Sequence, residues 1–156
     1  MSNKADIIIC RYAAEELGIQ FLVGFEIEFT LLKSTNPLVP VNDYQWSTTL
    51  AVSTGSVEAQ VLEEIADAIQ DDGIELQMYH AEAAPGQVRP SMYPSMYPVL
   101  LPFQYEVVTG PMSPLKAADA LVHTRETVYN IASKHGLRAT FAPRLAFDSC
   151  QSSNIL

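Results

Sequence analysis

The 156 residues include 18 acidic and 9 basic side chains, and the formal net charge of −9 at pH 7 argues against binding to nucleic acid, which requires clustered Lys and Arg. No apolar run approaches the roughly 20 residues that a membrane span needs, and the first residues lack the apolar region of a secretory signal. Since the only cysteines are Cys10 and Cys150, we expect one globular, cytoplasmic domain without disulfides and without membrane or nucleic-acid partners.

The N-terminal part of the chain predicts a helix followed by a strand. Residues 5–17 contain good helix formers and stop before Gly18, a residue suited to the end of a helix. Over residues 21–32, apolar side chains recur at every second position, which predicts a strand with one buried face. That face holds Phe21, Val23, Phe25, Ile27, Phe29 and Leu31, and the opposite face holds Gly24, Glu26, Glu28 and Thr30.

The middle of the chain predicts a loop, a second helix and a second strand. Prolines and many hydroxyl side chains indicate a long loop over residues 33–55, with or without short strands. Residues 57–72 have a helical apolar stripe, with Ser56 as the N-terminal cap and Gly73 as the end. Residues 74–83 alternate again, and the predicted strand carries Leu76, Met78, His80 and Glu82 on one face.

Prolines at positions 90, 94, 98 and 102 exclude a long helix or a central strand over residues 88–104. A short strand is predicted directly after them, at residues 105–109. A helix over residues 114–135 then begins with Ser113 as a cap and a proline in the first turn. Residues 138–143 are predicted to be extended.

The predicted first strand carries a pair of glutamates, Glu26 and Glu28. Side chains two apart on a strand project from the same face, about 6.6 to 7 Å apart. Two anions at this spacing need a cation, water or a proton between them. Solvent-facing strands often show the same pattern, so the pair alone indicates either a metal site or an ordinary charged surface.

Three segments together resemble the glutamine synthetase family. Gly24 to Phe29 matches the family's Gly-x-Glu-x-Glu-Phe motif, and His80 to Gln87 matches a His-x-Glu followed by Pro-Gly-Gln. The predicted long helix runs into His135 to Pro143, which matches His-Gly-Leu-x-Ala-Thr-Phe-x-Pro. The resemblance spans residues 5–145 except for 88–104.

The resemblance implies an α+β fold, a partial catalytic domain in which helices 57–72 and 114–135 pack on one face of an antiparallel sheet. The other face would carry Glu26, Glu28, Glu82 and Glu106 as metal ligands. By the family's pattern, the last three share one ion and Glu26 helps to hold a second, whereas His80 is interpreted as a core or supporting histidine. The implied reaction joins ammonia or another amine to the γ-carboxyl of glutamate, with ATP as co-substrate and Mg²⁺ or Mn²⁺ as the ions. The family forms homo-oligomeric rings, which we do not expect for this chain.

The chain departs from the family within the second motif and after Leu145. Removal of residues 88–104 gives a continuous Pro-Gly-Gln-Tyr-Glu-Val-Val, with Glu106 at the position of the third ligand. Valine codons begin with GT and glutamine can be encoded by CAG, so we interpret 88–104 as retained intron sequence; the alternative is a Pro-rich surface loop. Residues 1–145 are then a partial catalytic domain, and 146–156 an unrelated tail. We expect a fragment that is inactive alone, the alternative being a non-catalytic binding or regulatory relative.

Overall fold

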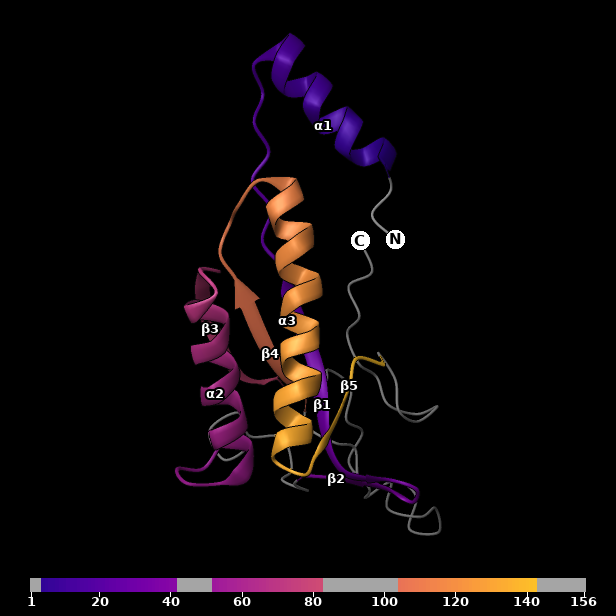
Figure 1. Ribbon diagram of the computed structural model, residues 1–156, viewed down its shortest axis with the longest axis vertical. Coiled ribbons are helices and arrows are strands. Elements are labelled where there is room, and N and C mark those ends of the chain that lie inside the picture. The colour runs from indigo at the N-terminus through magenta and orange to yellow at the C-terminus, as the bar shows by residue number, and fades with distance from the viewer. Residues whose placement is uncertain (1–3, 42–51, 83–103, 143–156) are drawn as a thin grey trace, which may run out of the picture.

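The computed structural model describes residues 4–41, 52–82 and 104–142, which form an antiparallel sheet with helices on one face (Figure 1). The elements in chain order are α1 (Lys4–Leu17), β1 (Glu26–Thr35), β2 (Leu38–Pro40), α2 (Val57–Asp71), β3 (Leu76–Glu82), β4 (Gln104–Thr109), α3 (Pro114–Lys134) and β5 (Arg138–Thr140). The strand order is β2-β1-β4-β3, and β5 also pairs with β1. These elements confirm the predicted α+β fold. Among the helices of the described residues, none has the length and apolar character to cross a membrane.

Strand β1 pairs with β4 on one side and with β5 and β2 on the other. Strand β3 pairs with the far side of β4. The strand begins at Glu26, later than predicted, and continues to Thr35. Of the predicted buried face, the part from Ile27 onward is buried, but Phe21 is 45% exposed. The prediction that residues 21–25 belong to this strand was wrong, because alternation alone does not show where pairing with the neighbouring strand begins. Strand β2 is a short strand within residues 33–55, the segment predicted as a loop with or without short strands, of which residues 42–51 are outside the described part.

Local signals placed the helices well. Helix α2 begins after Ser56, whose Oγ accepts a hydrogen bond of 3.2 Å from the N–H of Ala59. Gly73 follows this helix with a φ of 75°, a conformation that favours glycine. Ser113 occupies the predicted N-cap of α3, followed by Pro114 in the first turn, although its side chain makes no capping hydrogen bond. Helix α1 lies beyond the N-terminal end of α3 (Figure 1).

Helices α2 and α3 cover one face of the sheet, and the core lies between these layers. Its fully buried members come from β1, β4, α2 and α3: Phe29, Leu31, Val61, Leu62, Ile65, Ile69, Tyr105, Val107, Val128 and Ala132. The ring of Phe29 lies 6.1 Å from that of Tyr105 and 6.0 Å from that of Phe141. Since successive side chains of a strand point to opposite faces, this core leaves the other face of β1 and β4 to their polar residues.

Side-chain contacts connect α2 and its C-cap to α3 and its C-cap at two places. The Nε2 of His123 lies 2.6 Å from the carboxylate of Asp72, at the end of α2. At the end of α3, Lys134 and His135 both contact Glu64, the latter at 2.7 Å. The two histidines, predicted to be surface or capping residues, thus join the helix layer.

Strand β3 contains a bulge that changes which side chains share a face. Consecutive residues of β4 oppose Leu76 and Met78, so Gln77 is an extra residue. Leu76 therefore packs against the core, whereas Met78 is 52% exposed on the same side as His80 and Glu82. The prediction that Leu76 shares their face is wrong, because one extra residue inverts the alternation.

Candidate metal centre

Pairing of three strands brings the predicted glutamates to the face opposite the helices. Glu28 of β1 is directly opposite Glu106 of β4, which is in turn opposite His80 of β3. Glu26 lies two residues before Glu28 on β1, and Glu82 lies two residues after His80 on β3, so both share the face of the three opposed residues. Directly opposed residues in antiparallel strands have Cβ atoms about 4.5 to 5.5 Å apart, so these side chains can interact.

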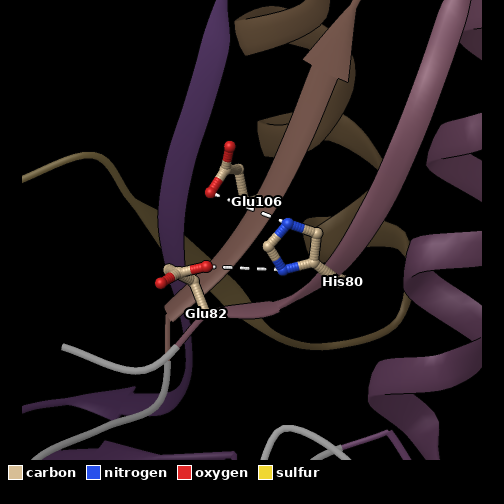
Figure 2. A group of neighbouring side chains, drawn as sticks. All are labelled: His80, Glu82 and Glu106. Carbon is tan, nitrogen blue, oxygen red and sulfur yellow. Dashed lines mark ion pairs between the residues drawn. The ribbon is translucent and has the colours of Figure 1, made fainter.

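The tightest group on this face consists of His80, Glu82 and Glu106, whose potential ligand atoms all lie within 4.8 Å of one another (Figure 2). The Nδ1 of His80 is 3.4 Å from Oε2 of Glu82, and its Nε2 is 3.8 Å from Oε2 of Glu106. Nδ1 also lies 3.1 Å from the carbonyl oxygen of Ala81. Because two acceptors face Nδ1, we assign the proton of a neutral ring to this atom, which directs the Nε2 lone pair toward a carboxylate. A cation between these two groups would satisfy both.

Glu28 lies in an environment that disfavours its negative charge. Burial raises its pKa above the usual value, and the negative charges of Glu82 and Glu26 raise it further. The side-chain amide of Gln104 partly opposes this shift, since its Nε2 donates a 3.4 Å hydrogen bond to Oε2 of Glu28. A bound cation would act in the same direction as this hydrogen bond.

Glu106 is the most buried of the four glutamates, with 7% of its surface exposed. Burial is the main cause that raises the pKa of Glu106; the positive charge available to His80 lowers it, and Glu26, Glu82 and Glu28 raise it again. The net direction is upward, as for Glu28. The two directly opposed carboxylates are therefore both destabilised as anions.

This set of donors fits a hard divalent cation. Carboxylate oxygens predominate, as Mg²⁺ and Mn²⁺ prefer, and burial together with the neighbouring negative charges disfavours the anionic forms of Glu28 and Glu106. With Glu82, these side chains would hold the ion. An ion held there would supply Lewis-acid chemistry, such as polarisation of a phosphoryl oxygen.

The sequence prediction and the described site agree on which face the glutamates occupy. Glu82 and Glu106 belong to the tightest group and Glu28 adjoins it, whereas Glu26 is exposed at the start of β1. Metal binding by these four remains a prediction. His80 was expected only to support the site, although its spacing two before Glu82 already placed it on the same face.

Sequence reasoning missed Gln104, which it assigned to the insertion. This residue is the first of β4, only 4% exposed, and hydrogen-bonded to Glu28. The chain has glutamine at both 87 and 104, so removal of 88–104 and removal of 87–103 give the same product. Gln87 would then occupy the position that Gln104 holds here.

The fold and the carboxylate-bearing face define the class of protein as an α+β domain with a candidate site for a divalent cation. The profile of the family "Glutamine synthetase, catalytic domain" matches residues 9–93 and 100–154. The chain belongs to the glutamine synthetase family.

Curated relatives agree with this assignment. The chain is 36% identical over 138 residues to protein fluG of Emericella nidulans, a match that covers 83% of this chain and 14% of that protein. It is 32% identical over 135 residues to the glutamine synthetase of Methanocaldococcus jannaschii, with 85% of this chain and 26% of the relative covered. The chain therefore spans about a quarter or less of the length of these relatives.

Solved structures show the same fold. The structure described as "Apo GmaS without ligand" superposes with a TM-score of 0.63 at 22% identity and covers 92% of this chain and 30% of that chain. A "novel glutamine synthase homolog" superposes with a TM-score of 0.59 at 24% identity and covers 95% and 28%.

Proposed function

We propose that this chain is the carboxylate-bearing part of a ligase active site that joins ammonia or another amine to the γ-carboxyl of glutamate with the use of ATP. The convergence of Glu28, Glu82 and Glu106 from three strands on one sheet face carries this proposal. These residues would hold one Mg²⁺ or Mn²⁺, and Glu26 would help to hold a second ion.

Names of relatives support glutamate as the substrate that receives the amine. Matches include a gamma-glutamylpolyamine synthetase of Streptomyces coelicolor at 28% identity and a glutamate–isopropylamine ligase of a Pseudomonas species at 27% identity. These two names share the glutamyl group and differ in the amine. We infer that glutamate is the conserved part of the reaction and that the amine is the variable one.

We further propose that the 156 residues bind a cation without turnover when expressed alone. Phosphoryl transfer needs a held nucleotide, placed ions and an oriented acceptor, and the loss of several such groups together costs many powers of ten in rate. The residues described on the open face supply the carboxylates, which meet only one of these needs.

The test combines Mn²⁺ calorimetry with an assay for γ-glutamyl hydroxamate, formed from glutamate, hydroxylamine and ATP. Three proteins are compared: the chain itself, the chain without 88–104, and the latter fused to the part of the M. jannaschii enzyme that follows its matched segment. We expect weak Mn²⁺ binding by the chain, reduced in Glu28→Ala but unchanged in Glu63→Ala on the surface of α2, and hydroxamate only from the fusion.

Each other outcome has a definite meaning. Equal Mn²⁺ binding by wild type and Glu28→Ala would show that the site is wrong. Hydroxamate formed by the unmodified chain would show that the chemistry requires fewer groups than proposed. Cation binding without hydroxamate from any of the three would favour the non-catalytic binding or regulatory relative.

A further inference from the structure

The pairing of β1 and β4 changes register immediately before Glu26. Within the ladder, Glu26 opposes Val108. Beyond it, Val23 and Met112 form an isolated bridge with two backbone hydrogen bonds, of 2.9 Å from the N–H of Val23 and 3.0 Å from that of Met112. Two residues on the β1 side thus face three on the β4 side, which is a β-bulge. Bulges redirect the side chains next to them and occur often beside active sites.

The side chain of Thr109 closes this bulge. The N–H of Phe25 donates a 3.0 Å hydrogen bond to Oγ1 of Thr109 in place of a carbonyl oxygen. In return, the N–H of Thr109 donates to the carbonyl of Phe25 at 2.9 Å, and the Thr109 hydroxyl lies 3.5 Å from the same oxygen. Thr109 is 1% exposed, so water cannot easily replace its hydroxyl.

Two glycines flank the bulge, Gly24 before β1 and Gly110 after β4, and neither site has room for a side chain. A Cβ on Gly24 would lie 2.7 Å from the carbonyl oxygen of Thr109, a distance that a side chain cannot adopt. A Cβ on Gly110 would lie 2.6 Å from Cδ of the Glu75 side chain. The N–H of Gly110 donates a 2.8 Å hydrogen bond to the backbone carbonyl of Glu75. The backbone of Gly24 therefore lies against that of Thr109 at the bulge, whereas Gly110 packs against Glu75 beside β3. The Thr109 hydroxyl bonds directly to Phe25, the residue before Glu26.

We propose that Thr109 is a positioning residue for the divalent cation. Its hydrogen bond to the Phe25 peptide fixes the backbone at the start of β1 and so the direction in which the side chains of Glu26 and Glu28 point. The inference rests on the proposed function, because Thr109 would help to form the same carboxylate site. Without the hydroxyl, the Phe25 N–H loses the acceptor that it uses at the bulge. The start of β1 then loosens, and the carboxylates that follow are no longer held in one direction.

The experiment compares Thr109→Val, which removes the hydroxyl at nearly constant shape, with Thr109→Ser, which keeps it. Thr124→Val is the matched control, because Thr124 is also fully buried, lies in α3, and has a hydroxyl without a partner among the described residues. Mn²⁺ alone is titrated into each full-length chain by calorimetry, and exchange of the Phe25 amide proton is followed by NMR. We expect Thr109→Val to weaken Mn²⁺ binding by about tenfold and to speed amide exchange. Thr109→Ser should restore both, and Thr124→Val should change neither.

The possible failures are distinct. If wild type does not bind Mn²⁺, the proposed metal site is refuted and the role of Thr109 with it. If wild type binds and Thr109→Val binds equally well, the role of Thr109 alone is refuted, even where its amide exchange is faster. Equal weakening by Thr109→Val and Thr124→Val would also overturn the proposal, because the effect would belong to any buried hydroxyl.

Discussion

Replacement of Glu106 by glutamine should stabilise the protein in the absence of metal, and bound metal should remove this advantage. The potential ligand atoms of Glu106 and Glu82 lie within 4.8 Å of each other. Two unit charges at that distance repel by roughly 3 kcal/mol at an effective dielectric constant near 20. Glu28 adds to this repulsion, and His80 offsets part of it. We therefore expect Glu106→Gln to raise the free energy of unfolding by about 1 to 3 kcal/mol in EDTA above neutral pH.

The effect of the same substitution depends on pH in a defined direction. The pKa of Glu106 is raised in the folded state, so the folded protein retains this proton to a higher pH than the unfolded chain does. The stability of the wild type should consequently fall as pH rises from the ordinary carboxyl pKa through the folded-state value. The advantage of Glu106→Gln should be absent below this window and complete above it.

Metal should remove the advantage. At a Mn²⁺ concentration of about 100 times its Kd, the wild type gains about 2.7 kcal/mol from binding, and the variant, which lacks a ligand, gains less. Urea unfolding with EDTA and with Mn²⁺ measures both arms, with Glu63→Gln on the exposed side of α2 as a control expected to change stability by less than about 0.5 kcal/mol. A Glu106→Gln protein that is less stable than wild type in EDTA would refute the argument from charge repulsion.

Three further outcomes are expected. Removal of 88–104 shortens the β3–β4 connection from 21 residues to 4, and should raise the free energy of unfolding in urea by about 1.5 kcal/mol through loop-closure entropy; a loss of stability would show that the segment packs usefully. Leu62→Ala should lower the unfolding free energy by about 2 to 5 kcal/mol in the same assay, since Leu62 is fully buried, and a loss below 1 kcal/mol would contradict the described core. Glu64→Gln should lower the urea midpoint near neutral pH, because hydrogen bonds from Lys134 and His135 lower the pKa of Glu64; its stabilisation is lost as pH falls through the folded-state pKa, so an equal effect in strong acid would refute it.

The helices could be predicted from the sequence because their signals are local. Ser56 and Gly73 mark the ends of α2 within two residues of the observed bounds, and the apolar stripe between them predicts its buried face. Strand boundaries depend on a partner that lies far away in the sequence. The start of β1 and the bulge at Gln77 were therefore missed, although alternation correctly identified the centre of β1.

The same distinction applies to the site. Alternation placed Glu26 and Glu28 on one face, but their meeting with Glu106 depends on pairing across strands, which only the family resemblance supplied. Thr109 gave no signal at all, because its role exists only where two strands change register. A threonine at the end of a short strand has no distinctive pattern without knowledge of that register.

The alternation of polar and apolar residues in β4 also disfavours pairing with β1 in the wrong register during folding. A slip of one residue against β1 would turn Glu106 toward the helices and expose Tyr105 and Val107, two of the largest buried side chains. Burial of an unpaired carboxylate costs several kcal/mol, so this misregistered pairing of β1 with β4 would be unstable beneath α2 and α3. Glu106→Val would remove this discrimination, and refolding of that variant should give more misregistered and aggregated protein even where its native state is stable.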